Sequence, residues 1–414
     1  MDSFWEELGL TDNPYDPRPL TISKEGRKLF VGRNKELSQL NSLVSGKKGG
    51  IVIIEGNVGV GKTSFVNIFQ HDKWKKNKYL PSFEKIGLVE NVDSVNFMLS
   101  VFSNMIHNLE RADNTDAYKR HPIHKQAKSL IATTIEKGYG GQFSVLGTGG
   151  GISQQKSISQ PVAIVLPSIV DMMNKWIQFV IDKMGYPAIL VPIDNLDIIQ
   201  ESGIVEFLNR MRDTLIERSS VWWILIGKIG LFSLLERETH RVSEIITGKP
   251  IILQPLTLDE IHEMIKIRFE NLKVITKVES LVPREIVDIL YEVSKGEARY
   301  ILKRITDIVY LFKSKYPSEK QIPLAIAKQM ITEEAKQRID EAKLTPRELQ
   351  FLKMMAKKGT FQPRDYKHFG LNTLQALKHY VDRLSMHGFI AKEETTGKAV
   401  YYHTTGDVNL FLRK

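Results

Sequence analysis

The chain has 414 residues and no cysteine. Disulfide bonds, thiolate zinc sites and cysteine nucleophiles are therefore excluded. The ten histidines form no HExxH pattern, and the nearest pair, His121 and His124, stands in a polar stretch that we interpret as solvated surface rather than a metal site. Since 42% of the residues are hydrophobic, we expect the chain to fold around a sizeable core.

Long hydrophobic runs are also lacking. The longest, residues 221–235, is interrupted by Lys228 and falls short of the roughly 18 apolar residues that a membrane span needs. The first residues, MDSFWEELG, are acidic where a secretory signal would be basic and then apolar. We therefore expect no membrane partner and a cytoplasmic location.

Positive charge is concentrated at one end of the chain. The formal net charge is +10, from 58 basic and 48 acidic residues. Residues 343–414 hold 13 Lys and Arg against 6 Asp and Glu, so this tail carries most of the excess. A local excess of positive charge favours a polyanion as partner.

Short apolar runs alternate with helical periodicity in the first part of the chain. The runs IVIIE, AILVPID and VWWILIG indicate buried strands, and the segments between them indicate helices. This order predicts an α/β fold with a mostly parallel sheet covered on both faces. The pattern then becomes all-helical from Pro255 to Glu341. We divide the chain into an N-terminal arm (1–29), an α/β core (30–254) with a glycine-rich insert (138–159), a helical lid (255–342) and a C-terminal module (343–414).

The run from Gly56 to Thr63, GNVGVGKT, is a complete GxxxxGK[ST] motif between the first strand and a helix. In this order the glycines let backbone N–H groups close on phosphates, and the helix N-terminus adds a positive field. Lys62 would reach the β- and γ-phosphates, and Thr63 would ligate Mg²⁺. We therefore expect an ATP or ADP site made by Gly56, Asn57, Val58, Gly59, Val60, Gly61, Lys62, Thr63 and Ser64.

A P-loop also needs a carboxylate at the end of a neighbouring strand to hold magnesium. The strand-like run AILVPID ends in Asp194, which we predict to be that ligand; the alternative is an ordinary helix N-cap. The next residue is Asn195, where fast ATPases usually have an acid. An amide can position water but cannot accept its proton. Hydrolysis should therefore be slow or partner-dependent, unless Asp197 replaces the missing acid instead of capping a helix.

Ahead of the P-loop, the segment FVGRNKEL (30–37) resembles the FxGRxxEL box of AAA+ ATPases of the origin-recognition group and of the related STAND and archaeal-type ATPases. The resemblance covers roughly residues 28–312. It implies a P-loop ATPase core followed by an all-α lid. In those families the box lies beside the adenine, which implies base contacts for Val31 and Gly32.

Later segments match the same families in the same order. VWWILIG resembles the strand that bears sensor 1, and Lys228 is the nearest polar residue after it. HRVSE is similar to the box with a trans-acting arginine, which implies that role for Arg241, although a glutamate replaces the family's second arginine. GEAR looks like the GxxR that opens the sensor 2 helix. The resemblance therefore implies that Arg299 reaches the γ-phosphate from the lid.

The basic tail begins with a clear helix start. Thr345 is a capping residue, Pro346 stands at the first helical position, and Glu348 lies three residues after the cap. A short second helix, a third helix over 371–388 with one apolar face, and two strands around a Thr-Gly turn follow. This order resembles a winged helix-turn-helix, in which the third helix enters the major groove of DNA.

Polar side chains of the third helix and the hairpin point outward once the apolar face is buried. The cations among them would hold phosphates, and Gln375 could contact a base. Winged helices also serve as docking surfaces for proteins, so duplex DNA or a protein is the expected partner. The predicted DNA contacts are Thr373, Gln375, Lys378, Arg383, Lys392 and Lys398.

The leading hypothesis is an ATP-binding ATPase that couples its nucleotide state to DNA binding and assembly through the winged helix. Self-association would add the avidity that one weakly basic module lacks. The alternative is a STAND-like signalling or defence switch, in which ATP is a conformational latch and the winged helix docks a protein. A transcription regulator with a vestigial P-loop is disfavoured, because the phosphate-binding residues are all present.

Overall fold

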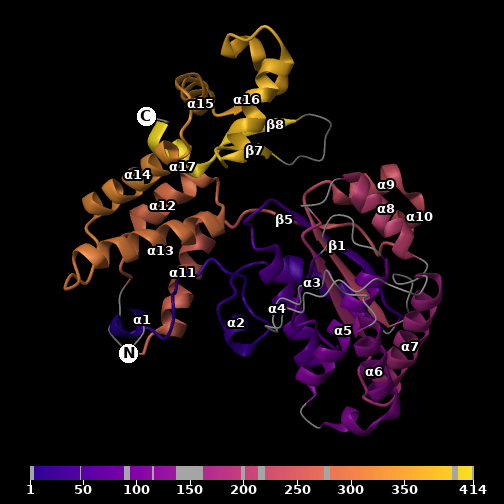
Figure 1. Cartoon of the computed structure of the whole chain (residues 1–414). Helices are drawn as coiled ribbons and strands as arrows, with labels where there is room; N and C mark the ends of the chain where they lie inside the picture. Colours follow the sequence, from indigo (N-terminus) through magenta and orange to yellow (C-terminus); the bar gives the residue numbers. More distant parts are fainter. Residues whose placement is uncertain are drawn as a thin grey trace.

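The computed structural model describes residues 4–46, 48–87, 94–113, 116–136, 162–196, 201–212, 220–274, 280–393 and 400–412. The glycine-rich insert (138–159), Asp197 and Lys398 lie outside these residues. Figure 1 shows three parts: a core built on a sheet, a helical lid, and a C-terminal module above the lid.

The core contains a five-stranded parallel sheet with the order β2-β3-β4-β1-β5. The predicted α/β fold with a parallel sheet is therefore confirmed. Because the strands are parallel, their carboxyl ends lie at one edge, where β1 leads into the P-loop and β3 ends in Asp194. The strands are β1 (Gly50–Gly56), β2 (Ile86–Gly87), β3 (Ile189–Asp194), β4 (Val221–Gly227) and β5 (Ile251–Leu253).

Alternating side chains of the central strands bury both faces of the sheet. Ile51 and Ile53 pack with one set of helices, whereas Val52 and Ile54 pack with α3 and α4. Helices α5 to α10 contribute to the first of these two cores. The helices of the core are α3 (Asn34–Leu43), α4 (Lys62–Asn77), α5 (Ser94–Ala112), α6 (Pro122–Glu136), α7 (Val162–Asp182), α8 (Glu201–Met211), α9 (Leu231–Glu238) and α10 (His240–Ser243).

The lid is all-helical, as the periodicity predicts. A capping box between Thr257 and Glu260 begins its first helix. Its helices are α11 (Leu258–Leu272), α12 (Arg284–Ser294), α13 (Ala298–Lys315) and α14 (Leu324–Glu341).

The N-terminal arm joins the lid to the core (Figure 1). Its first helix, α1 (Phe4–Glu7), lies against the lid, where Trp5 donates a hydrogen bond to Tyr310 Oη at 3.0 Å. Its second helix, α2 (Lys24–Lys28), packs on α4, where Arg27 pairs with an Asp72 oxygen at 3.2 Å. The N-terminal arm is therefore partly helical and fixed at both ends.

The C-terminal module is a winged helix. The predicted start of α15 is confirmed, since Thr345 and Glu348 form a reciprocal capping box. The sheet has the antiparallel order β6-β8-β7, and α17, which the sequence analysis did not anticipate, returns to the lid and packs on α12 and α14. The elements are α15 (Pro346–Lys358), β6 (Thr360–Phe361), the 3₁₀ helix η3 (Pro363–Phe369), α16 (Leu374–Met386), β7 (Ile390–Glu393), β8 (Tyr401–Thr404) and α17 (Gly406–Leu412).

One expectation about the surface is wrong. His124, interpreted as solvated, is buried in α6, where its Nδ1 accepts a hydrogen bond from Trp176 Nε1 at 3.2 Å. Burial lowers the pKa of His124, although Glu110 opposes the shift.

Within the described parts of the chain, no helix combines the length and the apolar character that crossing a membrane requires.

Candidate nucleotide-binding site

The P-loop connects the end of β1 to the first turn of α4. Gly59 and Gly61 have positive φ angles of 80° and 93°, a conformation that L-residues rarely adopt. A Cβ atom at Gly59 would lie 2.5 Å from Glu297 Cγ on the lid side, so a larger residue would collide there. The glycines therefore allow both the loop conformation and the close approach of the lid.

Lys62 and Thr63, the predicted phosphate-binding and metal-binding residues, lie in the first turn of α4. Lys62 Nζ donates hydrogen bonds to the carbonyl oxygens of Gly56 at 2.7 Å and of Asn57 at 3.0 Å, which holds the ammonium against the loop. Thr63 Oγ1 donates to Asp194 Oδ2 at 2.8 Å. The two predicted magnesium ligands are thus in contact, and their hydroxyl and carboxylate oxygens suit a hard cation such as Mg²⁺.

Asn195 follows Asp194 in a left-handed backbone conformation, with φ of 64°. Asparagine tolerates this conformation better than most residues. Its backbone N–H donates to Asp194 Oδ1 at 2.8 Å, and the residue lines the same pocket as the P-loop. Asn195 therefore lies in the pocket at the position where fast ATPases usually have an acid.

Lys85, which precedes β2, was missed by the sequence analysis. Its Nζ lies 3.4 Å from Asp194 Oδ2, the oxygen that also accepts from Thr63. Both an ammonium and Mg²⁺ are attracted to this carboxylate, so Lys85 is positioned to compete with the metal. No motif marks it, because the contact depends on the pairing of β2 with β3.

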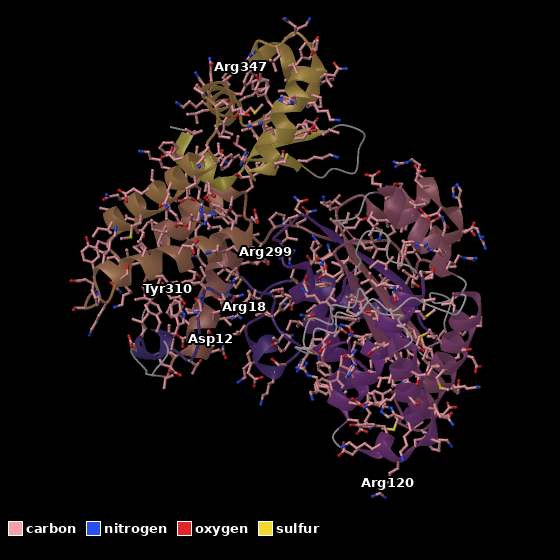
Figure 2. The ribbon with its side chains drawn as sticks, in the orientation of Figure 1. Asp12, Arg18, Arg120, Arg299, Tyr310 and Arg347 are labelled. Atoms are coloured by element: carbon pink, nitrogen blue, oxygen red, sulfur yellow. The ribbon has the colours of Figure 1, made fainter. Side chains whose placement is uncertain are left out.

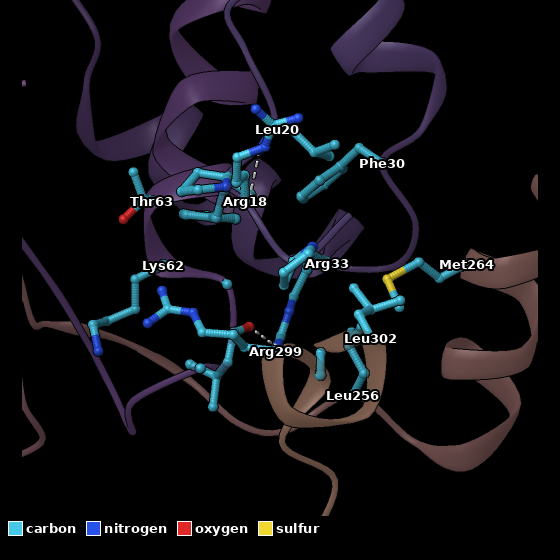
Figure 3. A pocket seen from close by; sticks show the side chains of 18 of the residues that line it. Arg18, Leu20, Phe30, Arg33, Lys62, Thr63, Leu256, Met264, Arg299 and Leu302 are labelled. Atoms are coloured by element: carbon cyan, nitrogen blue, oxygen red, sulfur yellow. Dashed lines mark hydrogen bonds between the residues drawn. The ribbon is translucent and has the colours of Figure 1, made fainter. Parts of the chain in front are cut away.

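The pocket is lined by all three neighbouring parts of the chain: the arm, the core with its P-loop, and the lid. Figure 2 places Arg18 and Arg299 where the lid meets the core. In Figure 3 Lys62 and Thr63 lie at one end, and Met264 and Leu302 of the lid lie at the other.

The segment FVGRNKEL contributes to the apolar end of the pocket. Val31 lines it, as predicted for a base contact. Gly32 instead faces the lid: its φ is 69°, and a Cβ atom there would lie 2.7 Å from Glu260 Oε1. Arg33, which the sequence analysis did not single out, is 8% exposed and donates to the carbonyl oxygens of Val60 and Gln254. It therefore joins the P-loop to the link between core and lid.

The lid reaches the P-loop through the start of α13. The backbone N–H of Arg299 donates to Gly59 O at 3.4 Å, and in Figure 3 its side chain extends toward the Lys62 side of the pocket. Glu297, the residue that contacts Gly59, has its pKa raised by burial, although Arg299 and Arg304 oppose the shift.

Two further positions that the family resemblance drew attention to are not among the lining residues. Lys228 is exposed directly after β4, and Arg241 is exposed on α10. The loop after β4 is fixed by the buried Glu55, which accepts hydrogen bonds from the backbone N–H groups of Gly230 at 3.2 Å and Phe232 at 2.7 Å. Burial raises the pKa of Glu55, and these two bonds oppose it.

Comparison with known proteins gives one informative likeness. No protein-family model and no curated protein matches the chain. Among solved structures, the Aeropyrum pernix ORC2 protein in its ADPNP-ADP complexes aligns over 96% of this chain and 95% of its own, with 12% identity and a TM-score of 0.52. The chain has the AAA+ fold. The resemblance drawn from the sequence motifs is therefore confirmed at the level of fold.

Two further structures align with this chain at lower TM-scores. The Aeropyrum pernix ORC1 protein in complex with DNA shows 15% identity and a TM-score of 0.47 over 94% of this chain and 96% of its own. Cdc6p from Pyrobaculum aerophilum shows 12% identity and a TM-score of 0.43 over 97% and 96%.

Helix α13 of the lid also holds the winged helix. Tyr300 Oη donates to Asp407 Oδ1 at 2.9 Å, and Arg304 donates to the two oxygens of the same carboxylate at 2.9 and 2.7 Å. Arg304 is 4% exposed and also contacts Asp307 and Glu334. One lid helix therefore contacts the P-loop at its start and α17 within its first two turns. The sequence analysis named none of these contacts.

Five of the six predicted DNA contacts are within the described residues, and all five are exposed: four lie on α16 or at its start, and Lys392 lies on β7. Gln375 and Lys378 lie on the outer face of the helix, while Thr373 caps its start by accepting from Ala376 N at 3.2 Å. Arg383 forms an ion pair with Glu348 of α15, so its positive charge is partly neutralised within the module. Two exposed cations on η3 were missed, Arg364 and Lys367.

Proposed function

We propose that the chain is an ATP-binding AAA+ ATPase that couples its nucleotide state to DNA binding through the winged helix. The contact of Thr63 with Asp194 beside the Lys62 ammonium carries this proposal, since it assembles phosphate-binding and metal-binding groups in one pocket. The nucleotides in the similar ORC2 structure support it. Mg²⁺ would be held by Thr63 and Asp194 and would neutralise charge on the phosphates.

Coupling would pass through α13. Arg299 at its start would meet the γ-phosphate, while Tyr300 and Arg304 hold Asp407 of α17. A helix is a rigid element, so a shift at its first turn moves its later turns as well. ATP and ADP would then favour different positions of the winged helix by differing in their contact with Arg299.

Hydrolysis by the lone protein should be slow, well below the roughly 10 turnovers per second that are usual for enzymes. The reason is that Asn195 cannot accept the proton of the attacking water. Asn195→Asp restores an acid that also tolerates the left-handed backbone, and it should raise phosphate release at least about tenfold, because general bases contribute about 100-fold or more. Steady-state phosphate release checks this. Fast turnover of the parent, or no gain in the variant, would contradict it.

Duplex DNA binding should depend on Lys378, the exposed cation at the middle of α16. Lys378→Glu should weaken binding and flatten the log-log dependence of affinity on salt by about 0.9, the value for one phosphate contact. Fluorescence anisotropy at several salt concentrations measures both quantities, and ATP binding should be unchanged.

The matched control for Lys378 is Lys353→Glu, which makes the same charge change at an exposed position of α15. Its effect on affinity should be much smaller. Equal effects of the two variants would show that only net charge matters. Unchanged DNA binding in both would remove α16 as the DNA-binding helix.

A second function, docking of a protein by the winged helix in a STAND-like switch, has one observation in its favour. Leu374 and Met386, at the two ends of α16, are 44% and 88% exposed. Large exposed apolar residues on one helix are typical of protein contacts. The salt dependence of DNA binding described above separates the two functions.

Two further expectations stay predictions. One is self-association, in which Arg241 would act on a neighbouring copy of the chain, and the other is a cytoplasmic location.

A further inference from the structure

Part of the N-terminal arm, residues 14–20, crosses the pocket; we call it the strap. On the lid side, Tyr15 is fully buried and its Oη lies 3.1 Å from Ser280 Oγ. On the core side, Leu20 N donates to Ser64 Oγ at 3.1 Å, and Asn67 Nδ2 donates to Leu20 O at 2.8 Å. The strap is therefore fixed at both ends beside the P-loop.

A buried arginine of the lid holds the middle of the strap. Arg268 lies on α11 and is 6% exposed. Its Nη1 donates to Asp16 O at 2.7 Å and to Pro14 O at 3.4 Å, so its acceptors there are backbone carbonyls rather than a carboxylate. Burial lowers the pKa of Arg268 to about 10, although the charge of Asp16 opposes this. The guanidinium is still a cation at neutral pH.

One donor of this guanidinium is unused. Arg268 Nε is buried and has no hydrogen-bond partner among the residues that the structure describes. A buried N–H without an acceptor costs free energy, and buried polar groups normally have partners. Arg268 is also among the residues that line the pocket, so its guanidinium group lies beside any ligand bound there.

The position of Arg268 indicates which part of a ligand it would meet. The P-loop end of the pocket suits phosphates, whereas the opposite end is lined by apolar side chains that suit the flat faces of a base (Figure 3). Arg268 follows Met264 of that apolar end by one turn of α11. Arg268 therefore lies beside the end that would take a nucleobase.

We propose that Arg268 is a base-reading residue whose guanidinium group donates a hydrogen bond to an acceptor on the edge of the nucleobase, and the proposal rests on the nucleotide binding proposed above. A guanidinium is donor-only, so it pairs with a ring nitrogen or a carbonyl oxygen but not with an amino group. The strap keeps the guanidinium in place, since two of its carbonyls accept from Nη1. Base recognition would thus involve the arm, the core and the lid together.

Two probes separate base reading from phosphate binding: ATP and inorganic tripolyphosphate, each titrated by calorimetry. Arg268→Met should weaken ATP binding at least about tenfold, the usual effect of losing a charged hydrogen bond, and change tripolyphosphate binding less than about twofold. Equal weakening of both probes would overturn the proposal. If neither probe binds the parent protein, the proposed function itself fails; if both bind and the variant matches the parent, only the base-reading role fails.

The control variant is Thr306→Val. Thr306 Oγ1 donates to Tyr15 O at 3.1 Å, so this variant removes another hydrogen bond between lid and strap while keeping the guanidinium. It should leave the ratio of ATP to tripolyphosphate affinity unchanged. The same loss of ATP selectivity in Thr306→Val would show that Arg268 acts only by holding the strap.

A second measurement needs no variant. The parent protein should bind one of the 1-deaza, 3-deaza and 7-deaza analogues of ATP at least about tenfold more weakly than ATP, because each lacks one ring acceptor. Full affinity for all three would overturn the proposal. So would weak binding of 2′-deoxy-ATP together with full affinity for these analogues, since the acceptor would then be the ribose.

Discussion

Lys62→Ala should lower the affinity for Mg-ATP by about a hundredfold, or about 2.8 kcal/mol. The ammonium already lies against the carbonyl oxygens of Gly56 and Asn57, in the loop whose N–H groups would bind phosphate. Removing it deletes charge-assisted hydrogen bonds to the phosphates, which are the strongest contacts such a pocket can make. Isothermal titration calorimetry with Mg-ATP measures the change.

Lys76→Ala is the matched control, because Lys76 is an exposed lysine near the opposite end of the same helix. Its affinity for Mg-ATP should equal that of the parent, and both variants should keep the parent's unfolding temperature within a few degrees. Equal ATP affinity in Lys62→Ala and the parent would refute the assignment of the P-loop.

Replacing Arg304 with methionine should destabilise the junction of lid and winged helix by about 3–5 kcal/mol, the usual cost of removing one partner from a buried charge cluster. Arg304 is the buried cation among the carboxylates of Asp307, Glu334 and Asp407. Without it, these groups repel one another and keep only donors at the edge of the cluster, such as the more exposed Arg338. Chemical denaturation followed by tryptophan fluorescence, together with limited proteolysis between lid and winged helix, measures the effect.

Arg338→Met is the control for this cluster. Arg338 contacts the same carboxylates, at 3.2 Å from Glu334 and 3.5 Å from Asp307, but its side chain is 39% exposed. Solvent screens such a pair, so the expected loss is less than about 1 kcal/mol. If both arginine variants lose the same stability, burial does not decide the strength of the cluster and the argument for Arg304 fails.

A milder change tests coupling directly. Asp407→Asn keeps an oxygen that can accept from Tyr300 but removes the charge that Arg304 binds. ATP affinity should be preserved, whereas any difference in DNA affinity between the ATP and ADP states should shrink. An unchanged difference would show that α13 does not transmit the nucleotide state.

Local sequence was enough to predict the three central strands β1, β3 and β4, the P-loop and the capping box at Thr345. The geometry of each depends on residues that are close together in the sequence. The P-loop needs glycines at positive φ, the capping box needs a hydroxyl before the helix, and the strands need short apolar runs. The contact of Thr63 with Asp194 could also be predicted, because parallel strands end at one edge of a sheet. The fold and the phosphate end of the pocket therefore follow from patterns that the chain displays in order.

The residues that were missed bind partners that sequence does not reveal. Arg33 and Arg268 donate to backbone carbonyls far along the chain, and every residue has such a carbonyl. Arg304 finds Asp407 only because α17 returns to the lid. His124 was misjudged for the same reason, since its polar neighbours in sequence say nothing of Trp176. Long-range packing decides these cases.

The winged helix is attached to the lid at two separate places, through the turn between α14 and α15 and through α17. A rigid body held at two points keeps one easy rotation, about the line that joins them. Movement of α13 would therefore tilt α16 in a fixed direction rather than release it to diffuse on a flexible linker. The orientation of bound DNA relative to the sheet, more than its affinity, would then report which nucleotide occupies the pocket.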